Sequence, residues 1–187
     1  MSPFTCKSLS LKGYSSFKHG LMKKLALFST ALILSITLFA QNAPQDPPYK
    51  RFPMVPPFRL LMQDSTTIFT KDDLKKNKKT LVFLFSPDCN HCQYEAGELV
   101  KNKDLFKDVQ VIMAGTAPLN QLQQFYETYQ LSQIDNLVMG KDYQYILPSF
   151  FMMKNFPFFA LYNKKKELII ALEGSHPMSR IKAAFDQ

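Results

Sequence analysis

Two cysteines separated by two residues are the part of this sequence best suited to chemistry, in the run Cys89-Asn90-His91-Cys92. Two sulfurs at this spacing can close a small disulfide ring. At the start of a helix the first sulfur also lies near the positive end of the helix dipole, where the thiolate form is favoured. Because the thiolate is the attacking form, we expect Cys89 to form a mixed disulfide with a partner and Cys92 to resolve it.

His91 lies between the two cysteines and is expected to tune them. A charged imidazole here would stabilise the Cys89 thiolate, which makes the oxidised pair a stronger oxidant. Other interpretations of the pair are a structural disulfide or a metal site, but a zinc site normally needs four ligands. Covalent haem would need His where Gln93 stands. We therefore expect no cofactor apart from a redox-active disulfide between Cys89 and Cys92.

The cysteine run follows a buried strand and opens a helix. The almost wholly apolar run TLVFLFS, residues 80–86, predicts a strand that is covered on both faces of a sheet. After the run, Cys92, Ala96, Leu99 and Val100 have the spacing of one helix face. The pair is thus predicted to lie at a strand-to-helix junction.

Other elements are predicted on both sides of this junction. The apolar patterns predict two short strands over 58–62 and 66–69, a helix cap at Thr70, and a second central strand over 109–114. They also predict an amphipathic helix over 119–131 and a short helix over 148–154 that begins at Pro148. A hairpin of 158–162 with 168–172 and a last helix over 178–185 follow. The alternation predicts an α/β domain whose central mixed β-sheet is flanked by helices and preceded by an amino-terminal β-hairpin.

The amino-terminal region has the pattern of a secretory signal peptide over residues 22–40. Two lysines follow Met22, and an uncharged apolar run extends from Leu25 to Ala40. This run of 16 residues is shorter than the ~20 needed to span a bilayer, so cleavage after Ala40 is expected. The chain is then exported to the periplasm or another extracytoplasmic compartment; an uncleaved membrane anchor is the alternative.

The segments before and after the signal peptide are predicted to lie outside the folded domain. Residues 1–21, with Cys6, precede a second Met and are interpreted as a mis-annotated upstream extension, so that translation starts at Met22. Residues 41–57 contain six prolines and predict an extended linker, which leaves 58–187 as the domain. The mature chain then has only two cysteines, too few for a framework of structural disulfides.

The formal charge of +8 resides mostly in the amino-terminal region. Residues 1–40 contain five lysines and no acid, and the remainder has 18 Lys and Arg against 15 Asp and Glu. This balance argues against nucleic-acid binding. The lysine clusters at 75–79 and 164–166 are interpreted as a solvated helix end and a solvated turn. The expected partners are protein thiols or disulfides and an electron donor, and a membrane only if the amino-terminal segment is an uncleaved anchor.

Three stretches of the chain resemble the thioredoxin-like superfamily, and more particularly its exported TlpA/ResA-like branch, which is related to the alkyl hydroperoxide reductase/thiol-specific antioxidant group. These stretches are FRLLMQDSTTIF, LVFLFSPDCNHC and NFPFFALYNKKKEL, and the resemblance covers Pro57 to Phe185. It implies an exported thiol-disulfide oxidoreductase. It also implies that Phe156-Pro157 is a cis peptide bond, with Pro157 facing the active-site disulfide.

Three positions depart from the family pattern. Asp88 stands where family members often have Trp. Phe83 stands where many thioredoxins have a buried acid, so the group that takes the proton of Cys92 is not identified. Asn90-His91 replaces Gly-Pro, which argues against a strongly reducing role. A reductant, an oxidant and an isomerase share the same residues and differ in reduction potential and partners.

Two other functions remain open at this point. A thiol peroxidase is suggested by Ser86, three residues before Cys89, although Val82 stands where peroxiredoxins have Pro. A copper-binding, Sco-like metallochaperone would use Cys89, Cys92 and His176 as ligands, since thiolates suit Cu(I). That family usually spaces its cysteines by three residues.

Overall fold

The computed structural model describes residues 46–186. The predicted upstream extension, the predicted signal peptide and the first residues of the predicted linker lie outside this range. The described residues form one α/β domain around a sheet of seven strands. In chain order the strands are β1 (Arg59–Leu61), β2 (Ile68–Thr70), β3 (Lys79–Leu84), β4 (Val109–Gly115), β5 (Leu137–Asp142), β6 (Phe158–Tyr162) and β7 (Leu168–Glu173).

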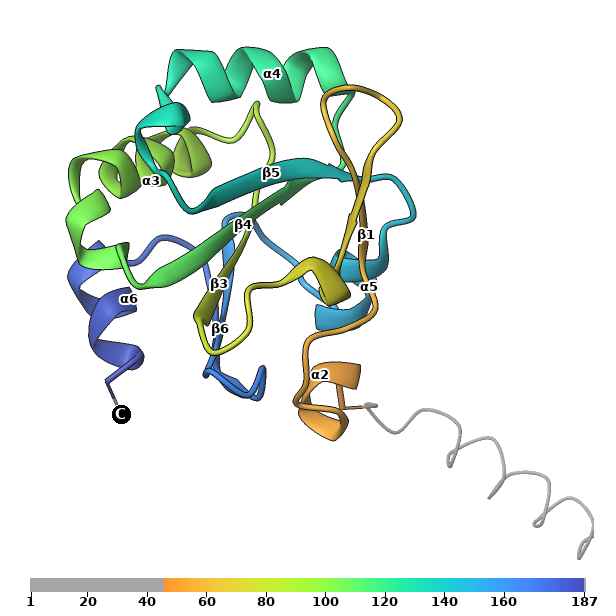
Figure 1. The fold of residues 1–187 in the computed structure, drawn as a ribbon, viewed down its shortest axis with the longest axis vertical. Coiled ribbons are helices and arrows are strands. Elements are labelled where there is room, and N and C mark those ends of the chain that lie inside the picture. Colours follow the sequence, from red (N-terminus) through yellow and green to blue (C-terminus); the bar gives the residue numbers. More distant parts are fainter. Residues whose placement is uncertain (1–45, 187) are drawn as a thin grey trace, which may run out of the picture. The chain divides into compact units, whose positions relative to one another are not determined.

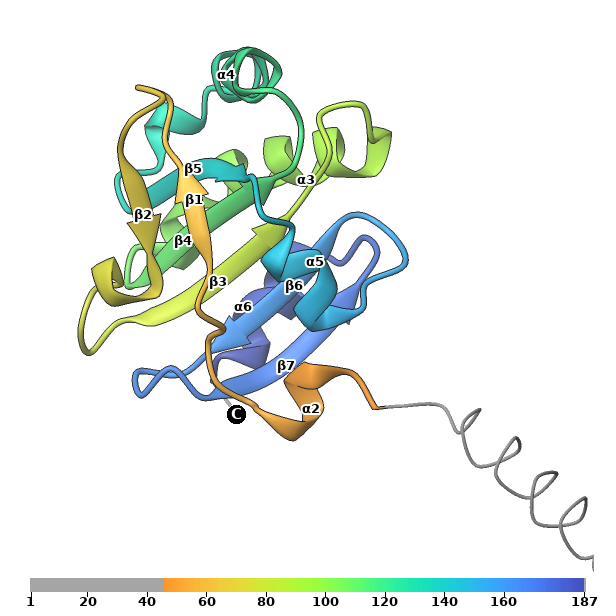
Figure 2. The ribbon, with the colours of Figure 1, turned by 90° about the vertical axis from the view of Figure 1, so that its right-hand side faces the viewer.

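The sheet is mixed, with β3 near its middle. The strand order is β2-β1-β5-β4-β3-β6-β7, and Figure 2 shows the strands side by side in this order. Strands β3, β4 and β5 are parallel, whereas β1, β2, β6 and β7 pair antiparallel with their neighbours. The predicted fold class is therefore confirmed, and the central position of β3 explains why its sequence is apolar on both faces.

Helices cover both faces of the sheet. The α-helices are α2 (Pro48–Arg51), α3 (Asn90–Lys101), α4 (Leu119–Thr128), α5 (Ile146–Phe151) and α6 (Met178–Ala184), and the 3-10 turns are η1 (Lys71–Asp73), η2 (Lys103–Phe106) and η3 (Leu131–Gln133). Alternate residues of β3 divide the core. Phe83 packs with residues of α3, α4 and α6, whereas Val82 and Leu84 pack with residues of α5 on the other face. Figure 1 shows these helices around the sheet.

Two elements differ from the sequence prediction. Strand β5 was not predicted, because only its first three residues are apolar and Gly140, Lys141 and Asp142 follow. The helix expected to open at Pro148 begins instead at Ile146. The reason is a cap from the end of β5: the Asp142 carboxylate accepts hydrogen bonds from the amides of Ile146 and Leu147 at 3.2 and 2.8 Å.

The prediction of an extended segment is wrong for residues 48–51 of the Pro-rich stretch. Pro48–Arg51 is a one-turn helix, since proline is tolerated in the first turn, where its missing amide has no partner to lose. The ring of Tyr49 lies 5.6 Å from that of Phe151, and Val55 is 9% exposed. This stretch therefore packs on the domain.

The described domain contains a complete core of its own. All buried residues of its two hydrophobic clusters lie between Val55 and Phe185. The predicted cap is also present, since the Thr70 hydroxyl and the Asp73 carboxylate form a capping box at η1. No helix within residues 46–186 is long and apolar enough to cross a membrane.

Candidate active site

The two cysteines lie where the central strand gives way to a helix, as predicted. After β3 the chain passes through Pro87 and Asp88, and Cys89 is the N-cap residue of α3. Hydrogen bonds within the connection hold it: the amide of Cys89 donates to the Ser86 carbonyl at 3.1 Å, and the side-chain amide of Gln93 donates to the Pro87 carbonyl at 2.8 Å. The first cysteine is thus fixed at the amino end of the helix.

The two sulfurs have different surroundings. Cys89 is partly exposed, and its sulfur accepts a hydrogen bond from the backbone amide of Cys92 at 3.3 Å. Cys92 is fully buried, and burial raises the pKa of its thiol strongly; the hydrogen bond with Cys89 and the charges of Cys89 and Glu95 act in the same direction. Both cysteines are free thiols in the structure. An accessible sulfur that receives an N–H bond is suited to attack, and a buried thiol needs a base before it can react.

Glu95, which the sequence analysis did not single out, is a buried acid one turn beyond Cys92. Its side chain is 1% exposed. One carboxylate oxygen accepts a hydrogen bond from the His176 amide at 3.0 Å, and the other has no hydrogen-bond partner among the described residues. Burial raises the pKa of this carboxyl, and the charge of Glu98 adds to the effect, while the His176 amide, the Ser175 hydroxyl and His91 oppose it.

The signal that could have revealed Glu95 is its place in the helical pattern. Residues three or four apart on a helix share a face, and Glu95 follows Cys92 by three positions on the stripe that continues to Leu99. An acid on a buried stripe is expensive unless it has a function or a partner. Phe83, six residues before Cys89, is a core residue, and the buried acid of this region is Glu95 on α3.

His91, Asp88 and His176 are distributed around this core of the site. His91 and Asp88 are exposed beside the cysteines. His176 lies in the loop between β7 and α6, where its amide reaches Glu95 and its ring nitrogen Nε2 lies 3.2 Å from the Glu173 carbonyl. No three His, Cys, Asp or Glu side chains within residues 46–186 form a group that could hold a metal ion. The ligand set suggested by Cys89, Cys92 and His176 is therefore not assembled in this part of the chain.

Pro157 lies at the same edge of the sheet as the cysteines. The peptide bond Phe156-Pro157 is cis, as the family resemblance implied. Leu84 at the end of β3 pairs with Phe158 at the start of β6, so Pro157 lies one residue beyond this pair, on the side toward the cysteine run. Its carbonyl accepts a hydrogen bond from the Gly174 amide at 2.8 Å. The role of Pro157 opposite the disulfide stays a prediction.

One surface hollow lies at the start of α3 and a second lies farther along it. One, of about 260 Å³, lies between the cysteine connection and α4 and is lined by polar side chains, among them Asp88, Gln93 and Gln121. The other, of about 290 Å³, lies between α3 and the loop that carries His176, and its lining includes Glu95. A partner bound at Cys89 would therefore contact mainly polar surface on the side of α4.

Comparison with known proteins places the fold. No family model matches the chain, and no curated protein sequence does either. Among solved structures, a secreted Mycobacterium tuberculosis disulfide oxidoreductase homologous to DsbE of E. coli is similar, with 16% identity, a TM-score of 0.58, and coverage of 69% of this chain and 94% of that one.

Two further structures extend the comparison. StoA from Bacillus subtilis has 17% identity and a TM-score of 0.55, over 71% of this chain and 98% of that one. The peroxidoxin BcpB from Mycobacterium tuberculosis has 14% identity and a TM-score of 0.60, over 71% and 94%. Both disulfide oxidoreductases and peroxidoxins thus share the fold of this domain, which is thioredoxin-like.

Proposed function

We propose that this domain is a thiol-disulfide oxidoreductase that exchanges disulfides with partner proteins through Cys89 and Cys92. The observation that carries the proposal is the asymmetric pair itself, an accessible sulfur at the helix N-cap and a buried thiol one turn inward that lies near a buried acid. The names of the similar disulfide oxidoreductases support it. A peroxidoxin is also similar in fold, but the buried second thiol next to Glu95 favours two-cysteine exchange.

In the reducing direction the first step is attack of the Cys89 thiolate on a partner disulfide. A new bond forms between the Cys89 sulfur and one partner sulfur, the partner's own S–S bond breaks, and its second sulfur leaves as a thiolate that takes a proton from water. The partner is now held by a mixed disulfide. The hydrogen bond from the Cys92 amide stabilises the negative charge on Cys89 before this attack.

The second step releases the partner. Cys92 loses its proton, attacks the Cys89 sulfur, and displaces the partner's sulfur as a thiolate. Two electrons have then passed from the protein dithiol to the partner disulfide, and Cys89 and Cys92 are joined. Glu95 takes the proton of Cys92, directly or through one water, because its carboxyl is the buried base nearest along this face of α3. Oxidation of a partner dithiol is the same sequence in reverse.

The proposed setting is extracytoplasmic. The signal-like pattern of residues 22–40 and a similar structure described as secreted support this placement. Two cysteines and no framework of further disulfides fit an exported redox domain better than a disulfide-stabilised one. The Cys89–Cys92 disulfide would be its redox group, with an electron donor in the same compartment.

The reduction potential of the purified domain tests the proposal. A reversible disulfide should form between Cys89 and Cys92 in defined thiol buffers, and the variant Cys89→Ser should not form it. A potential near about −270 mV would mark a reductant and one near about −120 mV an oxidant. If mass spectrometry found no Cys89–Cys92 disulfide at any buffer ratio, the proposed function would be wrong.

A further inference from the structure

The end of the sheet opposite the cysteines is formed by three segments that lie side by side. The amide of Val55 donates to the Lys166 carbonyl at 3.2 Å, and the amide of Leu168 donates to the Pro53 carbonyl at 2.7 Å. The Lys166 ammonium donates to the Lys78 carbonyl at 2.9 Å. These contacts join residues 50–54, 75–79 and 163–167 into one surface, which we call the lysine-rich end.

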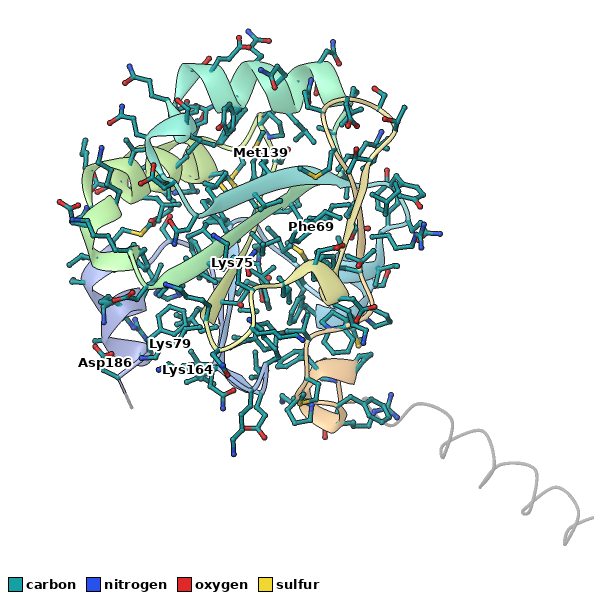
Figure 3. All side chains as sticks on the ribbon, viewed as in Figure 1. Phe69, Lys75, Lys79, Met139, Lys164 and Asp186 are labelled. Atoms are coloured by element: carbon teal, nitrogen blue, oxygen red, sulfur yellow. The ribbon has the colours of Figure 1, made fainter. Side chains whose placement is uncertain are left out.

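The lysine-rich end is strongly cationic. Its three segments contain nine Lys and Arg and one acid, Glu167. Lys164 and Lys165 are exposed at the tip of the β6–β7 turn, and within residues 46–186 neither forms an ion pair. Figure 3 shows Lys79 and Lys164 close together at this end, and both line a hollow of about 700 Å³. The positive charge is therefore concentrated and accessible.

Several acids border this surface and offset part of its charge. Asp186 lies 3.3 Å from the Lys79 ammonium, and Asp108 lies 3.4 Å from that of Lys78. These pairs are at the side of the end that faces α6 and η2. Asp46 lies 3.5 Å from the Lys50 ammonium, and Asp104 and Asp108 line the same hollow as Lys164. The nine cations still outnumber these acids and Glu167, and within residues 46–186 Arg51 and Lys165 form no ion pair.

Two exposed apolar side chains stand among these cations. Phe52 is 64% exposed and Met54 46% exposed. The Arg51 guanidinium lies 5.9 Å from the centre of the Phe52 ring, and Lys50 precedes it on α2. Met54 forms a β-bridge with Glu167 and so lies beside the lysines of the turn. Cations together with exposed aromatic and apolar side chains are typical of surfaces that bind at a membrane interface.

The course of the chain points to the same occupant. Asp46, at the start of the described domain, follows the apolar run Leu25–Ala40 after only five residues. Before any cleavage of the predicted signal peptide, the domain is thus entered at its lysine-rich end from the most apolar stretch of the sequence. A soluble acidic partner would explain the lysines, but it would not explain why Phe52 and Met54 are exposed beside them.

We propose that the lysine-rich end binds the surface of an anionic lipid bilayer. Lys164 and Lys165 of the β6–β7 turn and the cations of α2 contact lipid phosphates, while Phe52 and Met54 enter the headgroup layer. Strand β3 leads away from this surface for five residue steps, about 17 Å, before the connection to Cys89 begins. The cysteines then face away from the membrane, toward partner proteins. This inference does not depend on the proposed redox function.

Binding of the domain from Asp46 to Gln187 to lipid vesicles tests the proposal, because this part contains its own core. The domain should sediment with vesicles of phosphatidylcholine and phosphatidylglycerol, and only weakly with phosphatidylcholine alone. The double variant Lys164→Glu/Lys165→Glu should bind the anionic vesicles at least about tenfold more weakly, because each surface lysine contributes about 1 kcal/mol. Phe52→Ser/Met54→Ser should also weaken binding at unchanged net charge.

The matched control is Lys141→Glu/Lys154→Glu, which changes the net charge equally at the other end of the sheet. Lys141 lies near the carboxyl end of β5, and Lys154 precedes β6. This control should bind the vesicles within about twofold of the unaltered domain. Equal weakening by the control would overturn the proposal, as would equal binding to zwitterionic vesicles. An unchanged affinity of Phe52→Ser/Met54→Ser would overturn it too. Thermal unfolding of each variant checks that the fold is intact.

Discussion

The two ends of strand β3 each hold an ionisable side chain whose charged form is disfavoured by burial. Beyond the carboxyl end, Glu95 has a raised pKa, and one of its oxygens lacks a hydrogen-bond partner among the described residues. At the amino end, Lys166 has a pKa lowered by burial, but its ammonium donates to the Lys78 carbonyl at 2.9 Å and to the Thr80 hydroxyl at 2.7 Å. Burial disfavours the charged form of both side chains, but the Lys166 ammonium has hydrogen-bond partners and one Glu95 oxygen has none among the described residues.

This difference separates a reactive group from a structural one. A buried polar atom without a partner costs free energy, so a protein keeps it only where something else requires it. The free oxygen of Glu95 can accept a proton from Cys92, whereas the ammonium of Lys166 is occupied in joining the β6–β7 turn to β3. We therefore expect changes at Glu95 to alter rates and changes at Lys166 to alter stability.

The largest expected effect on turnover comes from removing the Cys92 thiol, whose proton Glu95 is proposed to accept. Cys92→Ser should lower turnover in an insulin-reduction assay by about a thousandfold or more, because the mixed disulfide on Cys89 can no longer be resolved. The same variant should accumulate that mixed disulfide, which mass spectrometry of the unreduced protein would detect. If Cys92→Ser kept the turnover rate of the unaltered protein, Cys89 would act alone, as in a one-cysteine peroxidase.

The next largest effect tests Glu95 itself. Glu95→Gln keeps the shape of the side chain but removes the base, and we expect the resolving step to slow by about a hundredfold near neutral pH. Stopped-flow measurement of Cys89–Cys92 disulfide formation after mixing with a partner disulfide would give this rate. The unaltered protein should show a rate that falls as Glu95 is protonated, and this limb of the pH profile should be absent in Glu95→Gln.

Glu98→Gln is the matched control for this prediction. Glu98 is one turn along α3 in the same hollow, and its carboxylate pairs with the Lys101 ammonium at 2.8 Å. Because the Lys101 end of this pair is 73% exposed and the pair lies at the surface, its loss should change the rate by no more than about twofold. If both variants slowed the step equally, the negative charge of the hollow would matter and Glu95 would not be the specific proton acceptor.

The sequence predicts the redox pair and its setting more fully than it predicts the acid. The apolar run of β3, the cap position of Cys89 and the cis bond before Pro157 all rest on local patterns or on the family resemblance, and the structure has the strand, the cap and the cis bond. The helical pattern places Glu95 on the same face of α3 as Cys92 and Leu99, but it does not show what covers the carboxylate. The amide of His176, 81 residues away in the chain, donates to it, and local patterns do not indicate a contact at that separation.

Strand β5 and the lysine-rich end show the same limit. The residues of β5 form a strand because β1 and β4 pair with them on either side, which compensates for their weak apolar pattern. The lysine clusters at 75–79 and 164–166 are unremarkable as separate runs, and they form one surface only because Tyr162 of β6 pairs with Thr80 of β3. Long-range pairing produces both features.

The third prediction concerns stability at the other end of β3. Lys166→Met keeps the length of the side chain but leaves the Lys78 carbonyl and the Thr80 hydroxyl without this donor, so the free energy of unfolding should fall by about 1–3 kcal/mol. Urea denaturation would measure the change. Lys165→Met, one residue earlier and exposed, is the control and should cost less than about 0.5 kcal/mol. Disulfide exchange should be the same in both variants.

The smallest effect is the pH dependence of stability, and it has opposite signs at the two ends. Because the pKa of Glu95 is raised above its ordinary 4.5, the folded protein holds this proton more tightly, and its contribution to stability is lost as the pH rises from about 4.5 through the folded value. Because the pKa of Lys166 is lowered below 10.5, the unfolded chain holds that proton more tightly, and stability rises as the pH approaches 10.5.

Comparison of each variant with the unaltered protein isolates these two contributions from all other titrating groups. Relative to the unaltered protein, Glu95→Gln should become more stable as the pH increases from 4.5 toward neutral. The stability deficit of Lys166→Met should be constant at acidic and neutral pH and should grow as the pH approaches 10.5 from below, because only the unaltered protein gains stability from the lowered lysine pKa. Urea denaturation at a series of pH values gives both curves. The stability difference between Glu95→Gln and the unaltered protein could instead be constant over the acidic range. This carboxyl would then titrate alike in the folded and unfolded chain, and the contrast between Glu95 as a reactive group and Lys166 as a structural one would lose its physical basis.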